Sequence, residues 1–187
     1  MADFWQMVEF SHLLMSRHIS AGAVVIDATA GNGHDSLMLA NLVGDEGRVY
    51  AFDIQEKAIS NTEKLLAEHK VLPRVKLFKD GHQNLDKYII EEIDGMIFNL
   101  GYLPGGDKEI ITNKETTIEA LEKGLELLKE GGLIILVVYT GHSGGEEELA
   151  ALLDFIAGLD SHIYNVLNYR FVNQQTAPQI LAIIRRN

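Results

Sequence analysis

Short apolar runs alternate along the chain with amphipathic segments in which apolar residues recur every three or four positions. Buried strands have the first pattern and surface helices have the second. The alternation predicts strands at 23–27, 48–53, 75–78, 95–99 and 133–139, and helices at 35–42, 56–70, 84–92, 114–129 and 146–157. Two further extended runs, at 163–171 and 179–184, follow with no clear helix between them. We therefore expect an α/β fold with a mostly parallel seven-stranded sheet, a C-terminal antiparallel hairpin and helices on both faces.

The same pattern sets the limits of the fold. Apolar residues recur at helical spacing from Phe4 onward, which predicts an amphipathic helix over about residues 4–20 that covers the sheet or a ligand. The helix at 114–129 is expected to stop at Gly131-Gly132, because glycine is common just past a helix end. No linker, internal repeat or low-complexity tract interrupts the alternation, so we expect one domain over residues 1–187.

Charge and composition narrow the function. The formal net charge of -11 argues against a broad basic surface for nucleic acid, so an RNA substrate would have to be held locally. The chain has no cysteine, and its seven histidines form no His-x-His or His-Glu-x-x-His pair, so we expect no disulfide, no cysteine nucleophile and no metal. No segment has the pattern of a secretory signal or of a transmembrane helix. We therefore expect a cytoplasmic protein with no membrane partner.

A glycine-containing turn follows the first predicted strand. Glycines at this point let the backbone approach a ligand closely, as in nucleotide pockets. The last glycine of the dinucleotide motif Gly-x-Gly-x-x-Gly is replaced here by Ser36, and the acidic Asp27 precedes the turn. A carboxylate at that place suits the cationic methionyl end of S-adenosylmethionine (SAM) better than a diphosphate. The candidate cofactor residues of this turn are Asp27, Gly31, Asn32, Gly33 and Asp35.

Two further strand ends carry groups that a nucleoside could use. Asp53 follows the second strand, where a carboxylate can accept hydrogen bonds from both ribose hydroxyls, and Gln55 lies just beyond it. Gly81 and His82 follow the third strand, at the usual location of groups that meet an adenine. Taken alone, Asp53 could be a helix cap and each glycine an ordinary turn residue. Three strand ends that carry such groups in the expected order favour cofactor binding.

Several segments resemble a known family, the small bacterial rRNA methylases, whose characterised members are the MnmM-type tRNA methyltransferases. The most specific are 98–108, Phe-Asn-Leu-Gly-Tyr-Leu-Pro-Gly-Gly-Asp-Lys, and 173–175, Asn-Gln-Gln; segments 27–35, 50–55 and 137–142 also match. The resemblance implies a Rossmann-like class I methyltransferase fold with SAM as the cofactor. It also implies methylation of the exocyclic amine of 5-aminomethyl-2-thiouridine at the wobble position of tRNA, in the anticodon region.

The loop after the fourth strand also resembles the Asn-Pro-Pro-Tyr loop of amino-methyltransferases. In that arrangement the carbonyl of an asparagine, here Asn99, accepts a hydrogen bond from the target nitrogen and aims its lone pair at the methyl group, while Tyr102 can stack on the base. A protonated amine has no lone pair, so the enzyme must bind the neutral amine or remove a proton. Asp107, His142 and a water held by Asn99 are the candidates for that task.

The acceptor side of the site therefore has candidate residues of two kinds. Asn99, Tyr102 and His142 are the candidate catalytic residues. The candidate substrate-contacting residues are Tyr102, Pro104, Asp107, Tyr139, Asn173, Gln174 and Gln175. Three adjacent amides at 173–175 could also be the polar turn of a hairpin, and the family resemblance favours substrate contact.

Other functions remain open at this point. An rRNA or a small molecule is the alternative acceptor within the methyltransferase class. An NAD(P)-dependent oxidoreductase would share the first strand, turn and helix, but the glycine motif is incomplete and no Tyr is followed four residues later by Lys. A non-catalytic nucleotide sensor is a further alternative. A homodimer is one way in which a small acidic chain could assemble a larger RNA-binding surface.

Overall fold

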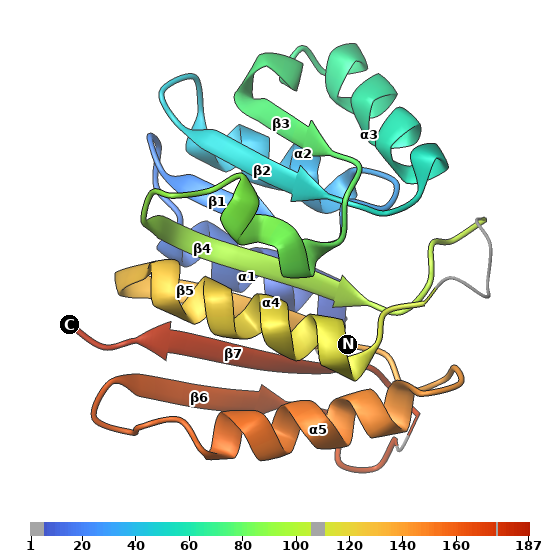
Figure 1. The fold of residues 1–187 in the computed structure, drawn as a ribbon, viewed down its shortest axis with the longest axis vertical. Coiled ribbons are helices and arrows are strands. Elements are labelled where there is room, and N and C mark those ends of the chain that lie inside the picture. The colour runs from blue at the N-terminus through green and yellow to red at the C-terminus, as the bar shows by residue number, and fades with distance from the viewer. Residues whose placement is uncertain (1–5, 106–110, 175) are drawn as a thin grey trace, which may run out of the picture.

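The centre of the molecule is a seven-stranded sheet (Figure 1). The computed structural model describes residues 6–105, 111–174 and 176–187. The strands are β1 (Val24–Asp27), β2 (Arg48–Phe52), β3 (Val75–Phe78), β4 (Ile93–Leu100), β5 (Leu128–Val138), β6 (Tyr164–Tyr169) and β7 (Gln179–Arg185). Their order in the sheet is β3-β2-β1-β4-β5-β7-β6. The strands β1 to β5 are parallel to one another, and β7 is antiparallel to both β5 and β6, as the sequence pattern predicts.

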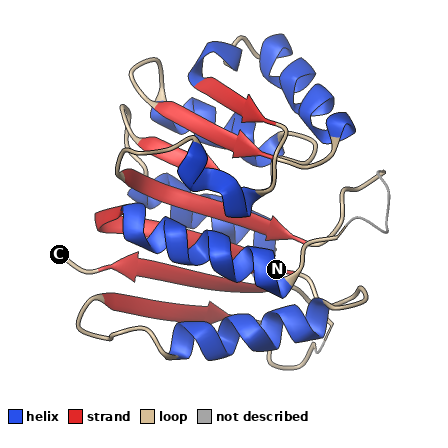
Figure 2. Cartoon of the chain, in the orientation of Figure 1, coloured by secondary structure: helices blue, strands red, loops and turns tan. Residues whose placement is uncertain are grey.

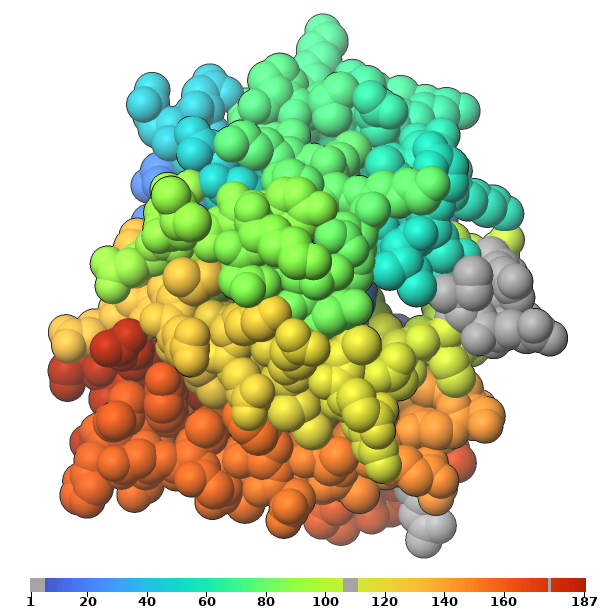
Figure 3. Space-filling view, viewed as in Figure 1, coloured from blue at the N-terminus to red at the C-terminus, as the bar shows by residue number. Residues whose placement is uncertain are grey.

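Helices cover both faces of this sheet (Figure 2). The α-helices are α1 (Met7–His18), α2 (His34–Val43), α3 (Glu56–Glu68), α4 (Lys114–Leu127) and α5 (Gly145–Ala157), and the 3-10 helices are η1 (Leu72–Arg74) and η2 (His82–Lys87). The buried residues of α1, α2 and α3 share one hydrophobic core, and those of η2, α4 and α5 share the other. The space-filling view shows the segments in the same order as the ribbon in Figure 1, from α3 and β3 at the top to α5 and β6 at the bottom (Figure 3).

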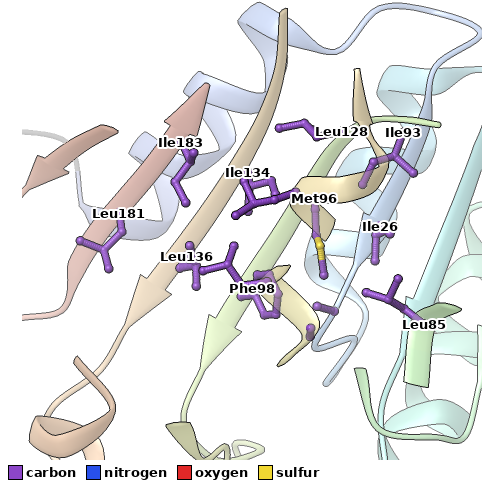
Figure 4. Close-up of a cluster of buried hydrophobic side chains, with 14 of the residues drawn as sticks. Ile26, Leu85, Ile93, Met96, Phe98, Leu128, Ile134, Leu136, Leu181 and Ile183 are labelled. Carbon is purple, nitrogen blue, oxygen red and sulfur yellow. The ribbon is translucent and has the colours of Figure 1, made fainter. Parts of the chain in front are cut away.

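The two cores exist because neighbouring residues of a strand point to opposite faces of the sheet. In β4, Met96 and Phe98 belong to the core under α4 and α5, whereas Ile97 between them belongs to the core under α1 and α2. Figure 4 shows the core under α4 and α5, in which side chains of η2 and of the central strands gather. A strand that is buried on both faces has a continuous apolar sequence, which is why the run at 133–139 predicts a strand so clearly.

The helix predicted at 84–92 is wrong. The segment forms the shorter 3-10 helix η2, and β4 then begins at Ile93, two residues earlier than expected. Leu85 and Ile89 have the spacing of a helix face and are both buried in the core beside α4, but Ile90 is 95% exposed. Packing of these two side chains therefore does not require a continuous helix.

The predicted boundary between α4 and β5 is also wrong. The helix ends at Leu127, before the glycine pair, and β5 begins at Leu128. Leu128 is fully buried and pairs with Ile93, and the register between β4 and β5 then shifts before the next pair of residues, Gly95 and Leu133. Gly131, with a φ of 75°, lies in this irregular stretch. The glycines therefore serve a bulge in a strand, which has the same sequence signature as a helix end.

The N-terminal helix covers the sheet as expected, but it is shorter than predicted. It begins at Met7 and ends at His18, and Ile19 beyond it is extended and buried. Residues 1–5 lie outside the described part of the chain. Within the described ranges, no helix has the length and apolar character needed to cross a membrane.

The topology brings five strand ends to one edge of the sheet. The strands β1 and β4 are neighbours at its centre, and the helices that follow them along the chain, α2 and α4, pack on opposite faces. In an open α/β sheet, this reversal of the winding leaves a crevice at the carboxyl ends of the two strands. The structure therefore places a cavity beside the glycine turn.

Two glycines with positive φ allow a test of how closely the glycine turn after β1 packs against α3. Gly33 lies in this turn, and Gly22, before β1, is the control. A Cβ on Gly33 (φ 88°) would lie 2.9 Å from the backbone Cα of Thr62 in α3, whereas a Cβ on Gly22 (φ 84°) would have no described atom within 4 Å. Gly22→Ala should lower the free energy of unfolding by about 1–2 kcal/mol, through the strain of the left-handed backbone alone. Gly33→Ala should lower it by at least about 1 kcal/mol more, because α2 and α3 must separate. Urea unfolding measures both losses, and equal losses would contradict the close packing.

Candidate active site

A cavity of about 950 Å³ opens at the carboxyl edge of the parallel strands. Its walls come from the loops that follow β1, β2, β3, β4 and β5, together with Val8 of α1 and Thr176 of the connection between β6 and β7. Twelve of the predicted site residues line it: Gly31, Asn32, Asp35, Asp53, Gln55, Gly81, His82, Asn99, Tyr102, Pro104, Tyr139 and His142. The structure thus brings the predicted cofactor loops and the predicted acceptor loop together around one space.

The remaining predicted residues are placed differently. Asp27 has no exposed surface and lies behind the cavity wall, and Gly33 starts α2 without lining the cavity. Asn173 and Gln174 are exposed and do not line the cavity, although Thr176 of the same connection does. Asp107 and Gln175 lie outside the described residues.

The carboxylate of Asp53 joins two of the predicted cofactor loops. Its Oδ2 accepts the backbone N–H of Gly31 at 3.0 Å, and its Oδ1 accepts the backbone N–H of Gln55 at 2.9 Å. Burial raises the pKa of Asp53, and these two backbone donors oppose that rise. Each carboxylate oxygen has a second lone pair, so Asp53 can accept further hydrogen bonds from a ligand in the cavity.

A buried acidic pair lies beneath the glycine turn. Asp27 accepts hydrogen bonds from the Ser36 hydroxyl at 2.6 Å and from the Thr29 N–H at 3.1 Å. Its burial, reinforced by the nearby charge of Asp35, raises the pKa of Asp27 to about 7. Asp35 lies in the first turn of α2, where the helix dipole favours a negative charge.

His82, which lines the cavity, has a ring nitrogen without a hydrogen-bond partner among the described residues. Its Nδ1 lies 3.0 Å from the carbonyl oxygen of Ala28 and must donate to it, because a carbonyl oxygen only accepts. Its Nε2 is buried with no hydrogen-bond partner among the described residues. Burial lowers the pKa of His82, which favours the neutral ring and leaves a free lone pair on Nε2.

Both the backbone and the side chain of Asn99 are held by the loop after β1 and the start of α2. The backbone N–H of Asn99 donates to the Thr29 hydroxyl at 2.7 Å, and its side-chain Nδ2 donates to Asp35 Oδ2 at 3.4 Å. The amide Oδ1 is then left for a different partner. Asn99 is thus fixed relative to the cofactor loops on which its predicted role depends.

The rest of the loop after β4 is anchored to α5. The backbone N–H of Gly101 donates to the hydroxyl of Thr112 at 3.0 Å, and that hydroxyl donates to Glu148 Oε2 at 2.9 Å. Glu148 is buried and also accepts the hydroxyl of Thr117 at 2.7 Å. A buried carboxylate without such donors would be costly, so this chain of bonds both stabilises Glu148 and fixes the loop.

His142, which lines the cavity, has a second ring nitrogen without a partner in the described part of the chain. Its Nδ1 lies 3.0 Å from the carbonyl oxygen of Ser143, so this nitrogen carries the proton and Nε2 is the acceptor of the neutral ring. Nε2 is buried and lacks a hydrogen-bond partner within the described ranges. The ring of Tyr102 meets that of His142 edge-on, with 6.5 Å between centroids.

The lining of the cavity is acidic. It contains three carboxylates, on Asp35, Asp53 and Asp80, whereas no lysine or arginine is among the described residues that line it. Such a site attracts a cation and repels a diphosphate. Within the described ranges, no group of three or more His, Asp or Glu residues could hold a metal ion.

Comparison with known proteins identifies the family. The model of the family described as "Putative rRNA methylase" matches residues 49–185. The chain belongs to this family. A relative from Arabidopsis thaliana, named a chloroplastic tRNA (mnm(5)s(2)U34)-methyltransferase, is 40% identical over 188 residues, which cover 95% of this chain and 69% of that protein.

Solved structures of the rRNA methylase type share the whole fold. A protein of Clostridium thermocellum described as an rRNA methylase has 45% sequence identity and a TM-score of 0.96, over 98% of this chain and 100% of that one. A methyltransferase of Streptococcus mutans, solved in complex with SAH (S-adenosylhomocysteine), has 38% identity and a TM-score of 0.89, over 98% and 99% of the two chains. The fold is therefore that of the class I methyltransferases.

The structure of this rRNA methylase family member also shows site residues that sequence reasoning missed. Thr29 lies within a segment that matches the family, but a hydroxyl offers no spacing signal for its bond to Asn99. Thr112 and Glu148 are 36 residues apart, and His12 and Asp35 are 23 residues apart. Contacts of this kind have no signature in a single sequence, because they depend on how α1 and α5 pack on the sheet.

The buried Asp27 predicts how stability depends on pH. Its pKa in the folded chain is about 7, above the ordinary value of 3.8, so the folded state binds more protons than the unfolded state between these values. The contribution of Asp27 to stability is therefore fully present below about pH 4 and is lost as the pH rises through about 7. We expect the stability of the Asp27→Asn variant, relative to the wild type, to rise over this interval. Urea unfolding of both proteins at several pH values measures the difference, and a constant difference would contradict the raised pKa.

Proposed function

We propose that this chain is a SAM-dependent methyltransferase that methylates the exocyclic amine of 5-aminomethyl-2-thiouridine at the wobble position of tRNA. The observation that carries the proposal is the position of Asn99, held by Thr29 and Asp35 in the wall of an acidic cavity beside the glycine turn. Membership of the rRNA methylase family and the relative named as a tRNA wobble-uridine methyltransferase support the same reaction.

The residues that line the cavity fit the parts of SAM. Asp53 can accept hydrogen bonds from the ribose hydroxyls, because its oxygens have free lone pairs beside the two backbone donors. The orphaned Nε2 of His82 is an acceptor of the kind that an adenine amino group needs. The negative charges of Asp35 and its neighbours favour the cationic methionyl end, and they disfavour the diphosphate of NAD(P).

The proposed chemistry needs a correctly aimed nitrogen. When bound, SAM supplies a methyl group on a positively charged sulfur. This sulfur is the leaving group, and it departs as a neutral thioether. The Oδ1 of Asn99 accepts a hydrogen bond from the target amine, so that the nitrogen lone pair faces the methyl group. Because the leaving group is already good, orientation by Asn99 provides most of the acceleration that the protein supplies.

The target amine must also lose a proton, because an alkylammonium has no lone pair at neutral pH. We assign this step to His142. Its Nε2 is the unprotonated nitrogen, since Nδ1 donates to the carbonyl of Ser143, and it is buried in the same cavity wall. The ammonium transfers one proton to Nε2, and the neutral amine then forms its new C–N bond while the C–S bond breaks.

The mouth of the cavity suits an unpaired base. Tyr102 and Ile54 both line the cavity and are 44% and 54% exposed. A base that is turned out of the anticodon loop can stack on such a tyrosine, which contributes about 1–3 kcal/mol. Because the chain has a net charge of -11, we propose that it binds the anticodon region locally, at this mouth. A homodimer would supply the remaining RNA-binding surface.

The reaction is tested directly with purified protein, SAM and tRNA that carries 5-aminomethyl-2-thiouridine. Nucleoside mass spectrometry should show conversion to 5-methylaminomethyl-2-thiouridine. Two RNAs serve as matched controls and should remain unmethylated: the same tRNA without the aminomethyl group, and rRNA from the cells that supplied the tRNA. Methylation of rRNA alone, or of no RNA, would overturn the proposed acceptor.

Asn99→Ala tests the orienting role. The variant should bind SAH with a dissociation constant within about threefold of the wild type, since Asp53 and His82 are intact, while kcat falls at least about 100-fold through loss of orientation. Asn165→Ala removes an exposed asparagine from β6 and should leave both quantities unchanged. Isothermal titration and initial-rate assays measure the two effects. Parallel losses of binding and rate in Asn99→Ala would argue for a structural role instead.

A further inference from the structure

His12 of α1 contacts the site from outside the loops that form most of it. Its Nε2 lies 2.6 Å from Oδ1 of Asp35, while Oδ2 of the same carboxylate accepts the side-chain Nδ2 of Asn99 at 3.4 Å. We infer that His12 is a positioning residue for the methyl transfer, because it holds Asp35 and thereby fixes the side-chain amide of Asn99. This inference rests on the proposed function of Asn99 and adds a residue that acts through it.

The direction of the Asn99 amide depends on what faces it. A primary amide has a donor end and an acceptor end, whereas a carboxylate only accepts. Beside Asp35, only the donor end Nδ2 is stable, so the acceptor end Oδ1 is left for the substrate amine. At 3.4 Å this bond is long, and it therefore depends on the carboxylate being held in place from its other side.

His12 supplies that hold. The side chain of Asp35 is 7% exposed, so water cannot replace a lost donor freely, and the buried Asp27 lies close enough to influence it electrostatically. The donor on His12 compensates the negative charge of Asp35. Without it, the carboxylate can rotate away from Asn99 Nδ2, and the amide then loses the acceptor that fixes which of its ends faces the substrate.

The helix that carries His12 is well anchored. The neighbours Ser11 and Met15 are buried, and Phe10 packs against Tyr169 of β6 with 4.4 Å between ring centroids. One turn before His12, Val8 lines the cavity. The N-terminal helix thus places one polar group at the site while its apolar face covers the sheet, so its role extends beyond covering.

Two variants that differ by one methylene group test the inference. His12→Gln puts a side-chain nitrogen near the place of Nε2 and should keep kcat within about threefold of the wild type, whereas His12→Asn is too short to reach Asp35. His12→Asn should lower kcat about 10- to 100-fold, with the KM for tRNA and the dissociation constant of SAH changed less than about threefold. His18→Asn is the control, because His18 is exposed on the same helix and bonds only within it among the described residues. Equal losses in the Asn and Gln variants of His12 would overturn the inference.

A double-mutant cycle tests whether His12 acts through Asn99. In an Asn99→Ala background, measured with radiolabelled methyl groups, His12→Asn should cause no further loss, because the amide that it positions is absent. Losses that multiply would mean that His12 acts independently of Asn99 and would overturn the inference.

A measurement without substrate separates this inference from the proposed reaction. Nitrogen-15 relaxation of the Asn99 side-chain amide should show a lower order parameter in His12→Asn than in the wild type, and a wild-type value in His12→Gln. If the wild type methylates no tRNA, the proposed function fails, and this comparison still decides whether His12 positions Asn99. An unchanged order parameter in His12→Asn would overturn the positioning role.

Discussion

The pairing of β1 with β4 determines where everything else in the site can be. Residues 25–27 of β1 lie in parallel register with 95–97 of β4, so the glycine turn and the Asn99 loop leave the sheet side by side. The hydroxyl of Thr29 then accepts the backbone N–H of Asn99 and ties the two loops together. A shift of one residue in this register would turn Asn99 to the other face of the sheet and remove it from the cavity.

The electrostatics of the site lower the stability of the fold. Burying Asp27 beside Asp35 is unfavourable, and the shifted pKa of Asp27 is a sign of that cost. The Ser36 hydroxyl, the Thr29 N–H and the start of α2 offset part of it. A cationic ligand would relieve the remaining repulsion, so the acidic lining makes the site selective for positive charge at the expense of the stability of the fold.

The sequence predicts the sheet and the polar groups at its edge better than it predicts their supports. Asp53 and Asn99 could be found because each directly follows or ends a buried apolar run. His12 and Glu148 could not, since they reach the site through packing of helices that are distant along the chain. The glycine pair at 131–132 was ambiguous for a different reason, because a strand bulge and a helix end both use glycine at positive φ. The expectation of substrate contact at residues 173–175 depends on the family resemblance, because three adjacent amides also fit the polar turn of a hairpin.

The position of β7 between β5 and β6 also constrains the order in which the protein can assemble. Residues 164–169 leave the ribosome before residues 179–185, yet they have no partner in the sheet until those later residues pair with β5. During synthesis, the long apolar edge of β5 and the whole of β6 therefore stay unpaired until β7 is made. Until then both can aggregate or bind chaperones. The pairing of β7 with β5 and β6 is thus the step of assembly that completes the sheet and stabilises its catalytic edge.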